Sequence, residues 1–440
     1  MKLIVTNPGM IHKERSLNYK TGDTDPGPLV ILNDKTDQSM LGFGASLTEA
    51  ACIVLNRMEQ GAREALLKEV YSPSEGNFSV GRICVGSSDY AEDQYDFAPV
   101  IDDMEMKHFD ASHDDLHILP VLRTCRKYNP DLFLFSSPWS PPGWMKTSAY
   151  ALGGGWMRQK YIDAYALYYL KFLQHYEKAG VRINGLTAQN ETETDQLGKM
   201  PACLWHPELE MQFAIKMRQL LDKNNFEDLK IWLMDHNLIM WRRALFQMND
   251  PETKAACAGI AWHSYEGHPE MINWFRDKHP ECENHWTEGH ILPLDLQVGF
   301  SKKFSIGDIS AGFIQAINNG CQSITVWNLA LDPVGYPNIG FFNCEGTLEI
   351  SRDGKTVNRS DEYHILLHFS RYIKRGARRI ILEFKALPKN FEVSGFINPD
   401  GSRILLIANT NSFDSDLIIC DREKNIPVRI SRESINTLIL

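Results

Sequence analysis

The chain has 440 residues, of which 43% are apolar, 10% aromatic and 23% charged, a composition typical of a globular protein. This length fits one large α/β barrel with an accessory domain, or three smaller domains. The formal charge of −10 and the lack of a basic stripe argue against nucleic acid as a partner.

Between residues 40 and 375, short apolar segments alternate with amphipathic stretches of helical periodicity. Eight strands are expected, at 41–45, 79–85, 131–137, 183–189, 229–235, 257–263, 284–288 and 322–328. The stretches 161–180 and 207–224 are expected helices, and the first of them ends at a glycine C-cap. Eight strands, each followed by a helix or a long loop, predict an α/β fold of the (β/α)8 TIM-barrel type.

Both ends of the chain lack helical periodicity. Residues 375–440 contain strand-like runs separated by turn signals such as "NPDG" at 398–401, and residues 1–35 are also poor in helical patterns. We interpret the two ends as one accessory antiparallel β-sandwich domain built from both termini. The expected boundaries are 1–36 for its N-terminal strands, 37–374 for the barrel and 375–440 for its C-terminal part.

Cysteine usage and the N-terminus bear on the cellular compartment. Nine cysteines are scattered without a C-x-x-C pair, so we expect free thiols rather than a zinc ribbon or a disulfide framework. No signal peptide is visible, which predicts a cytoplasmic protein as written, or a secreted or periplasmic one if a leader was removed. No apolar run approaches the ~20 residues of a transmembrane segment.

The candidate chemistry lies where the expected strands end, because the carboxyl ends of barrel strands line the active site. Two glutamates, Glu191 and Glu288, follow the fourth and seventh strands and therefore face the same mouth. Carboxylates in these positions can approach within roughly 5 Å, the separation of a retaining glycosidase pair. Other polar or aromatic side chains at strand ends are Asp89, Trp139, Asn190, Asp235, His263 and Trp327.

This pair predicts a double-displacement mechanism. Glu191 would protonate the glycosidic oxygen, and its pKa is expected to be raised by a partly apolar setting and by the second carboxylate. Glu288 would stay ionised and attack the anomeric carbon. Asn190 would donate a hydrogen bond to the sugar 2-OH.

Several sequence blocks, in order along nearly the whole chain, resemble one known family. They include "GFGASLTEAA" (42–51), "SSPWSPPGWMKT" (136–147), "GLTAQNE" (185–191), "HWTEG" (285–289) and "WNLALDPVGYPN" (327–338). The chain is similar to glycoside hydrolase family 30, and the blocks look most like those of its acid β-glucosidase (glucosylceramidase) branch and bacterial relatives. The resemblance implies a TIM barrel with a β-domain made by both termini.

The resemblance also implies roles for single residues. Glu191 would be the acid/base and Glu288 the nucleophile. The side chains expected to bind the −1 sugar are Asp89, Trp139, Asn190 and Trp327. Those expected to orient the nucleophile are Arg82, His263 and Tyr265.

The sequence departs from the family pattern directly after the acid/base. The family usually has Asn-Glu-Pro, whereas this chain has Asn190, Glu191 and Thr192. The loop "TETDQLGKMPACLW" (192–205) also differs from that of the human-type enzyme. The preference for the leaving group therefore does not follow from the resemblance.

Three other functions fit the sequence less well. A metal site is not expected, because the histidines of "HWTEGH" (285–290) and "HSYEGH" (263–268) lack a zinc-ligand spacing. A serine hydrolase is not expected, because "DISAG" (308–312) lacks the first glycine of a nucleophile elbow. A non-catalytic carbohydrate-binding barrel would normally have lost one of the two carboxylates, and both are present.

The sequence thus predicts a retaining β-glycosidase that needs neither a metal nor an organic cofactor. Its expected partner is a carbohydrate or glycolipid substrate, first a β-D-glucoside such as a glucosylceramide. The alternatives are a β-1,6-glucan, a β-xyloside or a β-fucoside. Exo or endo action and the oligomeric state are left open.

Overall fold

The computed structural model describes residues 1–18, 27–289, 304–422 and 424–440. By packing, the chain divides into two compact units. The first contains the described residues within Met1–Phe43, Ile291–Ile324 and Arg359–Leu440, and the second those within Gly44–His290 and Thr325–Asn358. The boundaries expected from the sequence stay a prediction.

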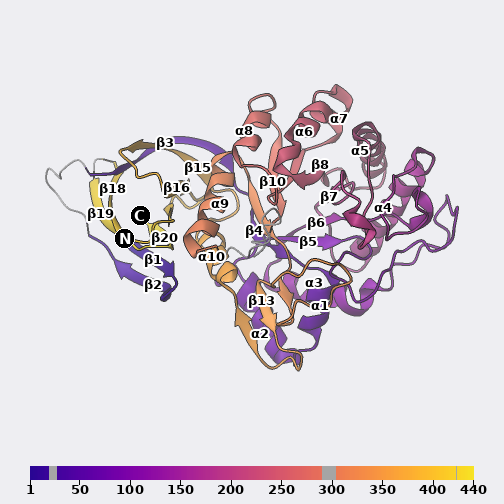
Figure 1. The fold of residues 1–440 in the computed structure, drawn as a ribbon, viewed down its shortest axis with the longest axis horizontal. Helices are drawn as coiled ribbons and strands as arrows, with labels where there is room; N and C mark the ends of the chain where they lie inside the picture. Colours follow the sequence, from indigo (N-terminus) through magenta and orange to yellow (C-terminus); the bar gives the residue numbers. More distant parts are fainter. Residues whose placement is uncertain (19–26, 290–303, 423) are drawn as a thin grey trace. The chain divides into compact units, whose positions relative to one another are not determined.

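Eight parallel strands form a closed barrel (Figure 1), as the sequence predicts. They are β4 (Gly42–Ser46), β5 (Val80–Cys84), β6 (Phe133–Ser137), β7 (Gly185–Thr187), β8 (Lys230–Asn237), β9 (Gly259–His263), β10 (Glu283–Glu288) and β11 (Ser323–Val326). Each strand pairs with its sequence neighbours, and β11 closes on β4. A Cβ on Gly44 would lie 1.8 Å from the carbonyl oxygen of Val80, so only glycine lets β4 approach β5 there.

Helices lie between the barrel strands along the chain. They are α1 (Glu49–Asn56), α2 (Gln60–Tyr71), α3 (Asp114–Tyr128), α4 (Ile162–Lys178), α5 (Pro207–Asp222), α6 (Trp241–Met248), α7 (Pro251–Ala256) and α8 (Glu270–Arg276). The short 3-10 turns are η1 (Gly143–Met145), η2 (Gln159–Tyr161), η3 (Gln196–Gly198) and η4 (Leu238–Met240). The expected helices at 161–180 and 207–224 are confirmed as α4 and α5. Pro207 starts α5, where its missing N–H leaves no helical bond unmade.

A small sheet that the sequence did not indicate follows β11. Its strands are β12 (Ala330–Leu331), β13 (Leu348–Ile350) and β14 (Val357–Arg359). These strands have only two or three residues each, too few for an alternating pattern to be recognised.

The second sheet belongs to the other unit and is built from both termini, as predicted. Its strands, in spatial order, are β19 (Lys424–Ile430), β18 (Ser415–Asp421), β3 (Leu29–Ser39), β15 (Arg378–Lys385), β16 (Phe391–Ile397), β17 (Arg403–Asn409), β20 (Ser434–Ile439), β1 (Lys2–Asn7) and β2 (Met10–Ser16). The N-terminal β1 pairs with the C-terminal β20 (Figure 1). The pairing is antiparallel, as predicted, except for one parallel pair, β3 with β18.

Side chains from strands far apart in this sheet share one apolar core. Leu3 on β1 packs in the same cluster as Leu417 on β18 and Ile426 on β19. The sheet therefore folds over itself into the two layers of a β-sandwich. The same unit contains α9 (Ile306–Asn318) and α10 (Asp361–Ser370).

Two further sequence expectations concern cysteines and membranes. All nine cysteines lie in the described part of the chain and are free thiols. Among the helices of the described residues, none combines the length and apolar character needed to cross a membrane.

Candidate active site

At the carboxyl end of the barrel, one histidine lies close to both candidate catalytic glutamates. Glu191 follows β7, Glu288 ends β10 and His263 ends β9, and all three are buried. The Nδ1 atom of His263 lies 3.2 Å from Oε1 of Glu191 and 3.9 Å from Oε1 of Glu288. The two oxygens can therefore be no farther apart than the sum of these distances. This bound is compatible with the ~5–5.5 Å separation of retaining glycosidases.

Arg82, fully buried on β5, connects Glu288 to the rest of the site. Its Nη1 donates to Oε2 of Glu288, and its Nη2 donates to Oδ1 of Asn190 at 2.7 Å and to Oδ2 of Asp235 at 2.8 Å. Burial lowers the pKa of Arg82, but the charges of Asp235 and Glu288 raise it above its usual range. A permanent cation is thus hydrogen-bonded to one oxygen of Glu288.

Asp235 accepts hydrogen bonds from both Arg82 and His263 and so orients their side chains. Besides Arg82, its oxygens accept from His263 Nε2 at 3.0 Å and from the hydroxyls of Ser137, Thr187 and Thr287 at 2.7 Å each. Burial raises the pKa of Asp235, but Arg82 and His263 together bring it far below its usual value. Asp235 therefore stays ionised and fixes its two cationic neighbours.

The charge of His263 overturns the expected direction of the pKa shift at Glu191. Burial lowers the pKa of His263, yet Glu288, Asp235 and Glu191 together raise it to about 9. Burial also raises the pKa of Glu191, but the hydrogen bond from His263 and the neighbouring His236 and Arg82 outweigh it, so this pKa is lowered. The sequence-based expectation was a raised pKa of Glu191, because it included only burial and the charge of the second carboxylate. Near neutral pH, His263 is therefore the cation and Glu191 the carboxylate of a hydrogen-bonded ion pair.

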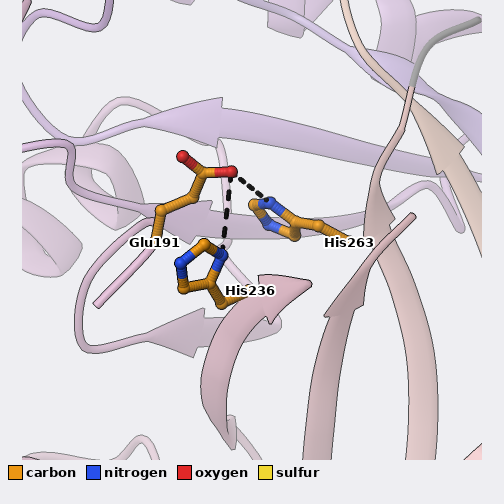
Figure 2. Close-up of side chains that lie close together, drawn as sticks. All are labelled: Glu191, His236 and His263. Carbon is orange, nitrogen blue, oxygen red and sulfur yellow. Dashed lines mark hydrogen bonds and ion pairs between the residues drawn. The ribbon is translucent and has the colours of Figure 1, made fainter. Parts of the chain in front are cut away.

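His236, which the sequence analysis missed, also faces Glu191. Its Nδ1 lies 3.8 Å from Oε1 of Glu191 and has no hydrogen-bond partner among the described residues. Figure 2 shows Glu191, His236 and His263 pointing toward one another. Burial is the main cause that lowers the pKa of His236, and the charge of Glu191 opposes it. Its position directly after Asp235 on a barrel strand was the only signal in the sequence.

These same three residues could hold a metal ion. One ligand atom from each of Glu191, His236 and His263 lies within 4.8 Å of the others. Two imidazoles and a carboxylate are ligands that Zn²⁺ accepts. The expectation of a metal-free site therefore stays a prediction. A second such group, on His279, Glu281 and Cys282, has the ammonium of Lys254 ion-paired to Glu281.

Two buried tryptophans pack beside Arg82. The rings of Trp139 and Trp327 stack with centroids 4.9 Å apart, and the Arg82 guanidinium lies 4.6 Å from the Trp139 centroid. Tyr265 donates from its hydroxyl to Oε1 of Glu288 at 2.9 Å. The structure thus brings this tyrosine, like Arg82, onto the oxygens of Glu288.

Asp89 lies beyond β5 and is also buried. Its Oδ1 has no hydrogen-bond partner among the described residues. Burial, followed by the charge of Glu288, raises the pKa of Asp89 well above its usual value. A carboxyl group in this state can both donate and accept a hydrogen bond.

The backbone at the site adopts unusual conformations. Glu191, Met234, Asp235 and Asn328 have φ of +52°, +74°, +46° and +60°. Non-glycine residues rarely occupy this left-handed region, and strain of this kind gathers at functional sites. At Asp235 it coincides with a bulge in β8, between Met234 and His236. Bulges re-aim side chains next to active sites, and this one directs Asp235 and His236 to different partners.

Comparison with known proteins gives one consistent result. The model of the glycosyl hydrolase family 30 TIM-barrel domain matches residues 40–373, and that of the glycosyl hydrolase family 30 beta sandwich domain matches residues 376–438. The lysosomal acid glucosylceramidase of Mus musculus is 26% identical over 419 residues, which cover 90% of this chain and 80% of that protein.

Two solved structures are similar over almost their whole length. SrfJ from Salmonella typhimurium has a TM-score of 0.91 at 26% identity, covering 100% of this chain and 99% of its own. The endo-beta1,6-glucanase BT3312 has a TM-score of 0.89 at 26% identity, covering 99% and 98%.

Proposed function

The chain belongs to glycoside hydrolase family 30 and is a glycoside hydrolase, and from this premise we propose that it hydrolyses β-D-glucosidic bonds with retention of configuration. The observation that carries the proposal is the pair of buried carboxylates held around His263, one of them paired with Arg82. The two kinds of named relative, a glucosylceramidase and an endo-β-1,6-glucanase, share a β-glucosyl unit on one side of the bond.

In the first step, Glu288 attacks the anomeric carbon while the bond to the leaving oxygen breaks. Glu191 gives its proton to that oxygen, so the leaving group departs as an alcohol. Arg82 and Tyr265 hold the oxygens of Glu288 and aim the carboxylate at the sugar. In the second step, Glu191 takes a proton from water as the water attacks the same carbon and releases Glu288.

Four side chains are proposed to bind the −1 sugar. The stacked Trp139 and Trp327 offer an apolar surface for the face of the ring. Asp89 has a buried oxygen that a sugar hydroxyl would satisfy. Asn190 has its amide oxygen on Arg82, which leaves the amide N–H groups for the 2-OH.

The leaving group is proposed first as a glycolipid, as in a glucosylceramide, in line with the glucosylceramidase relative. A β-1,6-glucan is the second candidate, because the structure of an endo-β-1,6-glucanase covers 99% of this chain.

The proposal is tested with nitrophenyl β-glucoside, β-xyloside, β-fucoside and β-galactoside, followed by a glucosylceramide and a β-1,6-glucan. We expect release from the glucoside by the wild type and none by Glu288→Gln, whose neutral amide cannot attack. Circular dichroism of the variant checks its folding. Hydrolysis of the xyloside or fucoside alone would reject the glucoside assignment, and unchanged activity of Glu288→Gln would reject the nucleophile.

A further inference from the structure

Both carboxylate oxygens of Glu191 are engaged by protein groups. Oε1 faces Nδ1 of His263 at 3.2 Å, and Oε2 accepts a hydrogen bond from Nε2 of Gln196. N–H donors on both oxygens favour the ionised carboxylate. A general acid must instead carry a proton on the oxygen that meets the leaving group. An N–H donor on that oxygen opposes its protonation, so the acid is favoured when the contact opens.

By elimination, we assign the contact from Gln196 to the leaving-group side. Oε1 is the oxygen directed at His263, which also lies beside Glu288, the residue that attacks the sugar. Oε2 is the other oxygen, and Gln196 is the donor that holds it. Gln196 belongs to the loop 192–205, which follows Glu191 directly and differs from the family pattern from Thr192 onward.

The loop holds Gln196 in place through a constrained turn. Gln196 and Leu197 have φ of +52° and +53°, a conformation that non-glycine residues rarely adopt. Asp195 stabilises the turn, because its Oδ1 accepts from the Leu197 N–H at 3.1 Å and its carbonyl accepts from the Gly198 N–H at 2.9 Å. Such a strained backbone persists only where surrounding contacts fix it.

The base of the loop is anchored to the segment 146–157. The buried ammonium of Lys146 donates to the carbonyl oxygens of Ala151 and Ala202, at 2.7 Å each. The same segment also approaches the residue before Gln196: a Cβ on Gly154 would lie 2.4 Å from the Cβ of Asp195, so glycine is needed there. At the tip, by contrast, Leu197 is 74% exposed. The side chain of Gln196 can therefore leave Glu191 while the base of the loop stays fixed.

We propose that Gln196 is a positioning residue that holds Oε2 of Glu191 in the free enzyme and is displaced when the leaving group enters. The freed amide then binds a hydroxyl group of that leaving group. This inference rests on the proposed function, because it assigns the acid role to Glu191. It makes the acid ready for proton donation only when a substrate occupies the leaving-group side.

The pH dependence of hydrolysis distinguishes this role from a structural one. In the pH profile of kcat/KM, the decrease on the alkaline side (the alkaline limb) gives the pKa of the acid in the free enzyme. In the profile of kcat, it gives the pKa of the acid in the substrate complex. The substrate is phenyl β-glucoside, whose phenol is a poor leaving group. For the wild type we expect the alkaline limb of kcat to lie at a pH roughly one unit higher than that of kcat/KM. This is the order of shift that one hydrogen bond to a charged group produces.

The test uses Gln196→Met, which keeps the length of the side chain but lacks the amide, with Leu197→Ala as the control in the same turn. In Gln196→Met the two limbs should coincide at the higher pH, whereas Leu197→Ala should keep them separate. Limbs that stay separate in Gln196→Met would overturn the inference. If Gln196→Met does not fold, Gln196→Glu replaces it; its second carboxylate should move the kcat/KM limb upward, and an unmoved limb would overturn the inference.

Two further results test the hydroxyl contact and the proposed function separately. Gln196→Met should lower kcat/KM for a β-1,6-linked glucosyl-glucose by up to about tenfold relative to phenyl β-glucoside, since one neutral hydrogen bond is lost. An unchanged ratio, or no cleavage of the disaccharide by the wild type, would reject the hydroxyl contact. A wild type that fails to hydrolyse phenyl β-glucoside would instead contradict the proposed function itself.

Discussion

Replacing Asp235 with Asn exchanges one carboxylate oxygen for an NH2 group and should destabilise the barrel. Asp235 accepts five hydrogen bonds, two of them from Arg82 and His263. An asparagine offers one oxygen, so its NH2 group must face donors on the other side. Removing one partner of a buried ion pair costs about 3–5 kcal/mol. We expect the lower end, about 3 kcal/mol, because Arg82 keeps Glu288 and Asn190.

The assay is thermal unfolding at pH 7, followed by circular dichroism. For a unit of this size each kcal/mol lowers the Tm by roughly 2–4 °C, so Asp235→Asn should lower it by roughly 6–12 °C. Thr287→Val is the matched control, because it removes one hydroxyl donor to the same carboxylate, a hydrogen bond to a charged group worth about 1.5 kcal/mol. A decrease for Asp235→Asn no larger than that for Thr287→Val would refute the reasoning.

Three other variants test separate parts of the account. Glu191→Gln should retain hydrolysis of substrates with very acidic leaving groups and be rescued by azide; product analysis by NMR should show the β-azide, and an α-azide would indicate inversion. Trp327→Ala removes a stacked ring and should lower kcat/KM for the aryl glucoside by roughly 10–100-fold, as expected for a few kcal/mol of apolar contact, and an unchanged kcat/KM would exclude this ring from the sugar site. In the β-sandwich, burial and the nearby His364 lower the pKa of His12 to about 4. As the pH falls, the unfolded chain binds this proton before the folded one does, so the free energy of unfolding should fall between pH 6.5 and about 4, by at most about 3 kcal/mol. Chemical denaturation at several pH values should show a smaller decrease for His12→Asn. The same decrease in the variant and the wild type would contradict the assignment.

The barrel could be predicted from the sequence because each of its strands is a short apolar segment between helical stretches. All eight expected strands overlap β4 to β11. In the other unit β19 has no clear strand pattern, since it contains Pro427, which cannot donate to a sheet ladder, and begins with Lys424 and Asn425. The strand lies at an end of the sheet, where proline is tolerated.

The site could be predicted only in part. Glu191 and Glu288 were identifiable because they end strands of the same barrel. His236 and Gln196 were not, because left-handed backbone at Asp235 and at Gln196 itself directs them to Glu191, and hydrophobic periodicity carries no such information.

The pKa of Glu191 was predicted in the wrong direction for a related reason. The cationic state of His263 results from three carboxylates that meet only in the folded chain. The roles of the individual residues stay predictions until variants are measured.

The assignment of Glu288 as the nucleophile is the central claim, and covalent trapping tests it most directly. The enzyme is treated with 2,4-dinitrophenyl 2-deoxy-2-fluoro-β-glucoside, digested and analysed by mass spectrometry. The fluorine slows the second step, so the glycosyl-enzyme should accumulate with the sugar attached to Glu288. A label on another residue, or no label on an enzyme that hydrolyses the parent glucoside, would contradict the account.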